Sequence, residues 1–470
     1  MSGTGGQTAA RGALVEVEVE SLAYGGAGVA RLGPDGLVVF VDGAVEGDQV
    51  LAQIYKRRRD YAQARAVELL RPSPLRIEPL ADHPGAPWQV LPYNRQLAVK
   101  EAQVKEALAK LGHLEGFAFE GIVPAVERWR YRNKVEFSFG FDREGRPVLG
   151  FHAPARWNRV VEVTDCLLCS KLANEALAAA REWAAAAPYL PWERGAEGGR
   201  RAGPDERGRA RLRNLVIREG RRTGELLVRL VVTPGELDAG GLLAGLRKRL
   251  GSSLAGFLIT RLEALGETTQ GGETELLYGS PFLRERLADL ELEIPYEAFF
   301  QTNTEMAELL YQRARAYAQA DQANLIFDLY CGLGVIGLLV AGRQRQLVGI
   351  ELSPQAVAAA ERIAAANVYS KARFHQGEVA KALPAVLAQT GRPEVVVVDP
   401  PRAGLGRRAV AAVLQAAPNR LVYVSCNPTT LAGDGARFAA AGYRLTRVCA
   451  VDMFPQTHHV ECVACFERSG

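Results

Sequence analysis

The sequence predicts an α/β protein in three parts: an N-terminal β-barrel, an α+β central region and a C-terminal domain around a mostly parallel sheet. Three observations carry this prediction. Short alternating strands separated by glycine turns fill the first part of the chain. From about residue 296, uninterrupted apolar strands alternate with helices, which is typical of a parallel sheet covered on both faces. A chain of 470 residues also has room for several domains, each with its own core.

The N-terminal part, residues 13–72, has the pattern of a small barrel. Residues 14–20 alternate between apolar and acidic side chains, which is the period of a half-buried strand. The glycines at 25–28 indicate a turn, and further strands are expected at 37–41, 50–54 and 64–70. Short strands with such turns predict a barrel of the oligonucleotide-binding type. Residues 1–12, which precede it, are expected to form a disordered tail.

A helix and a mixed region follow the barrel. Residues 94–112 predict one amphipathic helix that stops at Gly112. Its apolar positions are Leu97, Val99, Val104, Leu108 and Leu111. Strands are expected at 134–140, 214–218 and 225–232, and a loop is expected over 194–213, which is rich in Gly, Arg and acids.

Basic residues gather in two stretches although the net charge is only +4. Residues 56–76 hold seven Lys or Arg against two acids, and residues 194–222 hold ten Arg against four acids. Such clusters suit a polyanion, because each neutralised phosphate releases counterions. A solvated surface is the alternative for either cluster alone. Together with the candidate active site below, the clusters favour RNA or DNA as the partner.

The composition excludes several classes of protein. The chain is 48% hydrophobic and 23% charged, as in an ordinary globular protein, and its seven cysteines, an odd number, argue against a disulfide framework. Residues 1–7 lack the apolar core of a secretory signal, and no stretch approaches the ~18 apolar residues of a membrane span. We expect a cytoplasmic protein with no membrane partner and no obligate protein partner.

A glycine-rich loop in the C-terminal domain indicates a nucleotide site. The motif Gly332-Leu333-Gly334-Val335-Ile336-Gly337 follows an apolar strand and opens a helix, and Glu351 lies at the tip of the next strand. Glycines let the backbone approach a ligand closely, and an acid at that tip can bind both ribose hydroxyls. NAD and S-adenosylmethionine both present such a ribose, so this motif alone leaves the two open.

An acidic turn after a second strand favours base chemistry over hydride transfer. Four valines lead into Asp399-Pro400-Pro401-Arg402. A dehydrogenase has no standing need for a proline-stiffened acidic turn at this place. An enzyme that grips a flipped-out base does need a carboxylate for the polar edge of that base. A simple loop that closes the strand is the structural alternative.

Cys426 ends a third apolar strand and is followed at once by Asn427-Pro428, so the thiol is presented at a strand end. A thiolate that adds to carbon 6 of a pyrimidine makes carbon 5 nucleophilic, and a base must then remove the carbon 5 proton. Glu461, in a nearly apolar segment, is the candidate base. A buried structural cysteine and a strand-end ion pair are the alternatives for these two residues.

The other cysteines do not form a recognisable metal site. The pairs Cys166/Cys169 and Cys462/Cys465 are too far apart in sequence for a zinc ribbon, and Cys462 and Cys465 are expected in a strand of the core. Cys331 and Cys449 are expected to be packing residues. The adjacent His458 and His459 are expected in a loop near Glu461.

On these residues the chain resembles the RNA uracil-5-methyltransferase family, in the branch that acts on 23S ribosomal RNA and carries an N-terminal TRAM domain. The resemblance covers nearly the whole chain. It is carried by Phe299-Phe300-Gln301-Thr302-Asn303, Asp328-Leu329-Tyr330-Cys331-Gly332-Leu333-Gly334, Asp399-Pro400-Pro401-Arg402-Ala403-Gly404-Leu405, Ser425-Cys426-Asn427-Pro428 and His459-Val460-Glu461.

The resemblance implies a role for each part. Residues 13–72 would be the TRAM barrel, residues 73–93 and 113–295 a central RNA-binding domain, and residues 94–112 and 296–470 a Rossmann-like catalytic domain. Cys426 would be the nucleophile, Glu461 the base, and Asp399 would hold the uracil and the methyl-donor region. The glycines of the loop and three side chains would contact S-adenosylmethionine, with a fourth facing its adenine: Gly332, Gly334, Gln301, Tyr330, Glu351 and, at the adenine, Glu378.

Two positions depart from the family pattern. Val335 stands where relatives commonly have Asn in the glycine loop. Relatives in the ribosomal branch often bind a four-iron four-sulfur cluster, but residues 78–89 contain no cysteine and only Cys166 matches a cluster ligand. One thiolate cannot hold a cluster that needs four. We therefore expect no cluster, and packing around Trp88 in its place.

The sequence thus predicts an S-adenosylmethionine-dependent RNA uridine carbon-5 methyltransferase, with ribosomal RNA favoured and transfer RNA as the alternative. A cytosine-5 enzyme is the nearest rival, but Asp399 suits the uracil edge better. A dehydrogenase is supported only by the glycine motif. An RNA-binding protein without catalysis is supported by the barrel and the Arg clusters, and the intact set of Asp399, Cys426 and Glu461 counts against it.

Overall fold

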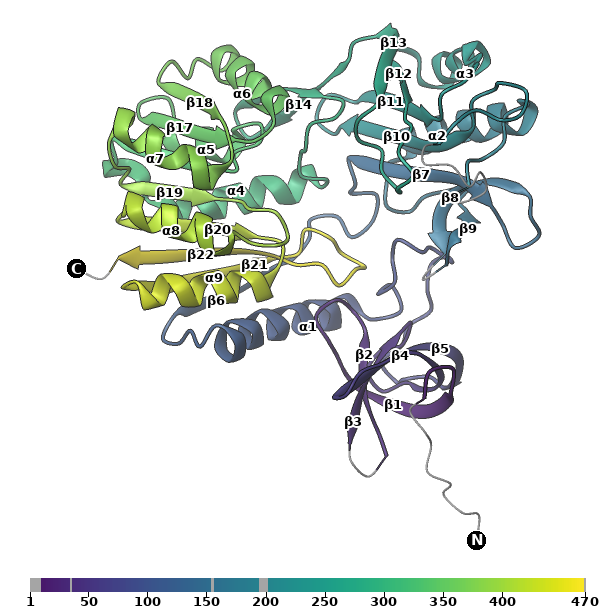
Figure 1. Cartoon of the computed structure of the whole chain (residues 1–470), viewed down its shortest axis with the longest axis horizontal. Helices are drawn as coiled ribbons and strands as arrows, with labels where there is room; N and C mark the ends of the chain where they lie inside the picture. The colour runs from purple at the N-terminus through teal and green to yellow at the C-terminus, as the bar shows by residue number, and fades with distance from the viewer. Residues whose placement is uncertain (1–9, 34–35, 154–155, 194–201, 469–470) are drawn as a thin grey trace.

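The structure is a computed structural model that describes residues 10–33, 36–153, 156–193 and 202–468. Most of the expected tail, and the start of the loop expected at 194–213, lie outside the described residues. Figure 1 shows a barrel, a central sheet domain and a larger α/β domain, with helix α1 (Tyr93–Glu106) lying between the barrel and the large sheet. None of the described helices is long and apolar enough to cross a membrane.

The N-terminal strands close into a barrel in the order β1-β2-β3-β5-β4. Val15, Val17 and Val19 point into its core while the acids between them face solvent, so the predicted alternation holds. β2 was not predicted, because the glycines before it indicate a turn. The five strands are β1 (Leu14–Leu22), β2 (Gly28–Leu32), β3 (Leu37–Asp42), β4 (Gln49–Arg57) and β5 (Tyr61–Arg71).

The central domain is built on a seven-stranded sheet in the order β13-β12-β11-β10-β7-β8-β9. Its strands are β7 (Lys134–Phe141), β8 (Pro147–Ala153), β9 (Arg156–Glu162), β10 (Leu212–Gly220), β11 (Glu225–Val232), β12 (Leu254–Arg261) and β13 (Glu273–Gly279). The helices α2 (Lys171–Ala186) and α3 (Gly240–Leu250) share one apolar core with this sheet. The strands predicted at 134–140, 214–218 and 225–232 lie within β7, β10 and β11.

The large domain has an eight-stranded sheet in the order β18-β17-β16-β19-β20-β22-β21-β6. The first five of these strands are parallel, and β22 is antiparallel to both of its neighbours. A hairpin of β14 (Phe282–Leu287) and β15 (Leu290–Pro295) joins the central domain to it. The sheet strands are β16 (Leu325–Leu329), β17 (Gln346–Glu351), β18 (Ala372–Gln376), β19 (Val395–Val398), β20 (Arg420–Ser425), β21 (Tyr443–Val451), β22 (Glu461–Arg468) and β6 (Ala118–Val123).

Helices cover both faces of this sheet, as its apolar strands predict. One face packs against α4 (Thr304–Ala318), α5 (Val335–Ala341) and α6 (Pro354–Ala366). The other face packs against α7 (Val379–Thr390), α8 (Gly406–Ala416), α9 (Pro428–Ala440) and the end of the helix that follows the barrel. The predicted fold class, a barrel, an α+β middle and a Rossmann-like domain, is confirmed.

The segment between the barrel and the central domain differs from the prediction in two ways. The single helix expected over 94–112 is α1 followed by a π-helical turn, Ala107–Leu111. The buried face of α1 holds Gln96, Lys100 and Gln103, because this face meets polar partners as well as apolar ones. Leu111, expected on the apolar face, is 58% exposed. β6 pairs with β21, so Ala118–Val123 belongs to the large sheet and not to the central region that was expected to begin at 113.

Candidate active site

Neighbouring strands of the large sheet end at one edge, and chemically active residues follow them there. β16 lies between β17 and β19, where the strand order reverses, and ligands of open α/β sheets bind at such a point. β22 runs against β20 and begins at this same edge, with Ser425 paired to Cys462. Cys426 and Glu461 are therefore next to this pair on neighbouring strands, although they lie far apart in the sequence.

The loop after β16 leaves its backbone accessible at the glycines. Gly332 and Gly334 have φ angles of +53° and +74°, which L side chains rarely adopt. A Cβ at Gly332 would meet open space, whereas one at Gly334 would come within 2.8 Å of the Phe374 ring. The Gly332 N–H donates to Glu351 Oε2 at 3.1 Å, so the acid predicted at the strand tip does lie beside this loop.

Asp328 lies buried beneath the glycine loop, and one of its oxygens is unsatisfied. Oδ2 accepts the Gly337 N–H at 2.9 Å, while Oδ1 has no hydrogen-bond partner among the described residues. Burial raises the pKa of Asp328 to about 8. An open glycine backbone above a buried carboxyl oxygen fits a nucleoside cofactor that carries its own hydrogen-bond donors.

Tyr330 and Glu378 follow β16 and β18, the strands on either side of β17, which ends in Glu351. Tyr330 follows β16 with a φ of 63° and is half-buried, and burial and then the charges of Asp434 and Glu378 raise its pKa. Glu378 precedes α7 and is exposed, and its carboxylate pairs with Lys381 at 2.5 Å. The structure therefore brings both predicted cofactor residues close to Glu351, because the Tyr330 N–H donates to the Ile350 carbonyl and the Gly377 N–H donates to the Glu351 carbonyl.

Asp399 is hydrogen-bonded to an uncharged side chain, that of Gln301. Gln301 is 5% exposed and lies just before α4, and its side chain is hydrogen-bonded to both Asp399 and Tyr311. Burial outweighs the Gln301 hydrogen bond and raises the pKa of Asp399 to about 7. Tyr311 was not predicted from the sequence, because it lies inside a helix with nothing in its local pattern to single it out.

Cys426 is half-buried, and the loop that carries it is tied to the Asp399 loop. Asn427 caps α9 through the Thr429 N–H at 3.0 Å, and its Nδ2 donates to the Arg402 carbonyl at 3.1 Å. Burial, reinforced by the nearby charges of Glu461 and Asp399, raises the pKa of Cys426 to about 11, while Arg402 lowers it. Cys426 is thus a thiol at neutral pH until something stabilises its anion.

Glu461 is 3% exposed and belongs to the same charge cluster. Burial and the neighbouring Asp399 raise the pKa of Glu461 well above its ordinary value, and Arg402 lowers it. The structure therefore brings together the three residues that the sequence singled out, Asp399, Cys426 and Glu461. Arg402 is the cation that lowers the pKa of Cys426 and Glu461 in this cluster. It belongs to the Asp399-Pro400-Pro401-Arg402 motif but was not predicted as a site residue.

Two histidines form the wall beside Arg402. The His458 and His459 rings lie 4.1 Å apart, and Arg402 contacts His459 Nδ1 at 3.1 Å. Burial lowers the pKa of His458 to about 4 and that of His459 to about 3. Both imidazoles are therefore uncharged at neutral pH.

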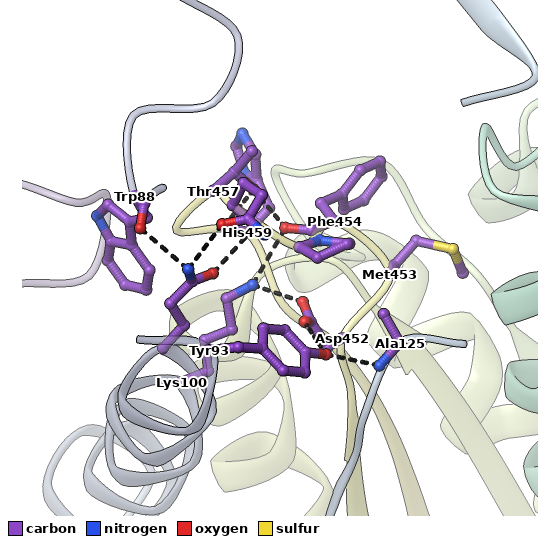
Figure 2. A network of polar contacts seen from close by, with 12 residues as sticks. Trp88, Tyr93, Lys100, Ala125, Asp452, Met453, Phe454, Thr457 and His459 are labelled. Atoms are coloured by element: carbon purple, nitrogen blue, oxygen red, sulfur yellow. Dashed lines mark hydrogen bonds and ion pairs between the residues drawn. The ribbon is translucent and has the colours of Figure 1, made fainter. Parts of the chain in front are cut away.

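The segment between β21 and Glu461 is fixed by a buried polar network (Figure 2). Lys100 of α1 donates to Asp452 Oδ1 at 2.5 Å and to the Phe454 carbonyl at 3.1 Å. Tyr93 donates to Asp452 Oδ2 at 2.7 Å. Lys100 and Asp452 are both 0% exposed, so helix α1 sets the path of the chain that leads into Glu461.

Cys166, the one residue that matches an iron–sulfur cluster ligand of the family, contacts a histidine. His83 Nε2 lies 3.3 Å from Cys166 Sγ, and hydrogen bonding from Cys169, with His83, lowers the pKa of Cys166 to about 5. Trp88, expected to fill this place, packs instead against the barrel and α1. No group of three or more potential metal-ligating side chains occurs in the described part of the chain. The absence of a cluster stays a prediction, which iron and sulfide assays on anaerobically purified protein test.

The strand order, the glycine loop and the acid at the next strand tip define a nucleoside-binding α/β domain attached to a β-barrel. The sequence matches the tRNA (uracil-5-)-methyltransferase family over residues 273–469 and the TRAM domain over residues 9–67. The chain belongs to the RNA uracil-5-methyltransferase family and carries a TRAM domain.

Relatives align with this chain over nearly its whole length. An RNA methyltransferase of Chlorobaculum tepidum is 36% identical over 460 residues, which cover 93% of this chain and 92% of that protein. Another from Gloeobacter violaceus is 37% identical and covers 98% of this chain and 97% of its own length. The tRNA (uracil-54, C5)-methyltransferase of Pyrococcus abyssi, solved with S-adenosyl-L-homocysteine, is 25% identical with a TM-score of 0.72, covering 96% of this chain and 100% of that one.

Proposed function

We propose that this protein methylates carbon 5 of a uridine in ribosomal RNA through a covalent adduct between Cys426 and carbon 6 of the base. The observation that carries the proposal is the meeting of Cys426, Glu461 and Asp399 at the carboxyl edge of the large sheet, beside the glycine loop. Each of the three influences the charge state of another, which supports their acting together on one base.

Cys426 acts as the nucleophile and Glu461 as the base. The Cys426 thiol gives up its proton to solvent as its sulfur adds to carbon 6, and the carbon 5–carbon 6 double bond opens to an enolate that makes carbon 5 nucleophilic. The Asp399 carboxyl hydrogen-bonds the polar edge of the uracil. When bound, S-adenosylmethionine supplies a methyl group on a sulfonium centre. Glu461 then takes the carbon 5 proton, the carbon 5–carbon 6 double bond re-forms, and the Cys426 sulfur leaves. Burial makes Glu461 a stronger base than an exposed carboxylate, because it raises its pKa.

We assign the cofactor to the part of this edge where β16, β17 and β18 end. Gly332 and Gly334 bring the loop backbone close to the ligand, and Glu351 binds its ribose hydroxyls. Gln301 and Tyr330 contact the methyl-donor part, and Glu378 faces the adenine. The unsatisfied Asp328 oxygen accepts a donor of the ligand.

A basic cleft between the barrel and the central domain supports RNA as the substrate. The cavity has a volume of about 460 Å³ and is lined by Arg65 of β5 and by Arg143 and Arg159 of the central domain. None of its described lining residues is acidic. Guanidinium groups from two domains suit the phosphates of one RNA backbone. Replacing Arg143 or Arg159 by Ala should reduce the salt dependence of RNA binding, with an unchanged slope counting against the cleft.

Ribosomal RNA is the proposed target and transfer RNA the alternative. The TRAM barrel and the resemblance to the ribosomal branch favour the first. The alternative rests on the likeness to the Pyrococcus abyssi enzyme, which is named for a transfer RNA position and aligns over its whole length. Methylation assays on both purified RNAs, with the modified uridine mapped, decide between them.

Tritium release tests the reaction itself. RNA tritiated at uridine carbon 5 should lose tritium when incubated with protein and S-adenosylmethionine, and no release from either RNA would contradict the proposal. Cys426→Ala should abolish release while cofactor binding persists. Glu461→Gln should accumulate an RNA–protein adduct that survives denaturation, because the carbon 5 proton then has no acceptor.

A further inference from the structure

The first loop of the barrel reaches into the candidate active site. Tyr24 lies between β1 and β2, and its hydroxyl donates to the carbonyl oxygen of Cys426 at 3.2 Å across 402 residues of sequence. Its phenol is half-buried among the same groups that surround the thiol: burial raises the pKa of Tyr24 to about 12, with contributions from Cys426 and Glu461 and an opposing one from Arg402. At neutral pH this hydroxyl therefore keeps its proton and is a hydrogen-bond donor.

The backbone of this loop is held in place on both sides. The Ala23 N–H donates to the Ala27 carbonyl at 2.8 Å, which closes the loop on itself. Gly26 has a φ of +90°, and a Cβ there would come within 2.8 Å of His458 Nδ1. The glycine thus lets the barrel loop lie directly against the histidine wall of the site.

The strand that leads into the loop is anchored to α1. Gln103 Nε2 donates to the Leu22 carbonyl at 2.9 Å, and Leu22 packs in one apolar cluster with Trp88 and Val99. The same helix carries Lys100, whose ion pair with Asp452 fixes the chain before Glu461. One helix therefore positions both the barrel loop and the approach to the candidate base.

We propose that Tyr24 is a positioning residue of the methyl-transfer reaction, which holds the Cys426 carbonyl and thereby orients the thiol toward the base. The TRAM barrel then supplies a part of the active site in addition to its RNA-docking surface. The inference rests on the proposed role of Cys426. It concerns orientation only, since the Tyr24 hydroxyl contacts the backbone of Cys426 and no reacting atom.

The test measures adduct formation in the presence of S-adenosylmethionine with RNA that carries 5-fluorouridine at the target position. After methyl transfer the fluorine at carbon 5 cannot leave as a cation, so the adduct persists. Tyr24→Phe removes only the hydroxyl. At saturating RNA we expect the single-turnover rate of adduct formation to fall about tenfold, the effect of one lost hydrogen bond, with unchanged dissociation constants for RNA and S-adenosyl-L-homocysteine. Methylation of ordinary RNA should show a lower kcat at the same KM.

Tyr61→Phe is the matched control, because Tyr61 is a barrel tyrosine whose ring packs against Phe40, with ring centroids 5.7 Å apart. It should form the adduct at the wild-type rate. Gly26→Ala keeps the Tyr24 hydroxyl but pushes the loop away from His458, so it should slow adduct formation as well.

The outcomes separate the two proposals. If the wild type and Tyr61→Phe form no adduct, the covalent mechanism is wrong. If both form it and Tyr24→Phe matches their rate, the role of Tyr24 is wrong while the mechanism stands. A Tyr24→Phe variant that binds RNA more weakly but reacts at the wild-type rate when saturated would make Tyr24 an RNA-binding residue and overturn the positioning role.

Discussion

Replacing Lys100 by Met should destabilise the large domain strongly, because it leaves a buried carboxylate without its cation. The Lys100 ammonium and the Asp452 carboxylate are 2.5 Å apart, and both side chains are 0% exposed. Burial lowers the pKa of Lys100, and the charge and hydrogen bond of Asp452 oppose that effect. Once Lys100 is gone, the Tyr93 hydroxyl is the remaining side-chain donor to Asp452 in Figure 2.

The expected loss follows from the cost of an unpaired buried charge. Removing one partner of a buried ion pair costs about 3–5 kcal/mol, whereas removing both charges costs much less. Lys100→Met should therefore lower the free energy of unfolding by that amount in urea titrations. The double variant Lys100→Met/Asp452→Asn should recover at least half of it, since Asn keeps an acceptor for the Tyr93 hydroxyl.

Lys110→Met is the control on the same segment, since Lys110 pairs with Glu106 at the surface with 72% of its side chain exposed. An exposed pair of this kind is worth under about 0.5 kcal/mol. A loss below about 1 kcal/mol for Lys100→Met would refute the reasoning. A double variant no more stable than the single one would refute it equally, because the cost would then not be that of the stranded charge.

Three further predictions concern the site. Gly334→Ala should weaken S-adenosyl-L-homocysteine binding in calorimetric titrations more than Gly332→Ala does. Both positions have a positive φ, but only at Gly334 would the added Cβ come within 2.8 Å of the Phe374 ring. The free energy of unfolding should fall as pH rises from about 6.5 to 8, because the folded-state pKa values of Asp328 and Asp399 are raised from 3.8 to about 8 and about 7. Below about pH 6.5 the lowered pKa values of His458 and His459 act in the opposite direction. A rise between about pH 6.5 and 8 in urea titrations would contradict the burial of these carboxyls. Arg402→Leu should move the pH profile of adduct formation to higher pH, since Arg402 lowers the pKa of Cys426 and Glu461; an unchanged profile would mean that neither group limits the rate.

Local sequence patterns predicted the elements and much of the candidate site. Alternating valines and acids specify β1, and four valines before Asp399 specify a buried parallel strand. The glycine loop and Glu351 could be placed because a loop at a strand end and the tip of the next strand in the chain are neighbours in a parallel sheet. Such predictions succeed because the period of side-chain burial is a local property of the chain.

Only the tertiary structure decided which distant residues meet. The antiparallel course of β22 sets Glu461 beside Cys426, and the pairing of β6 with β21 moves a segment from before the central domain into the large sheet. Tyr24 and Lys100 carry no local signal, since a tyrosine in a turn and a lysine in a helix are ordinary surface residues. Their roles arise from the packing of the barrel and α1 against the loops of a sheet that lies hundreds of residues further along the chain, and no local period specifies that packing.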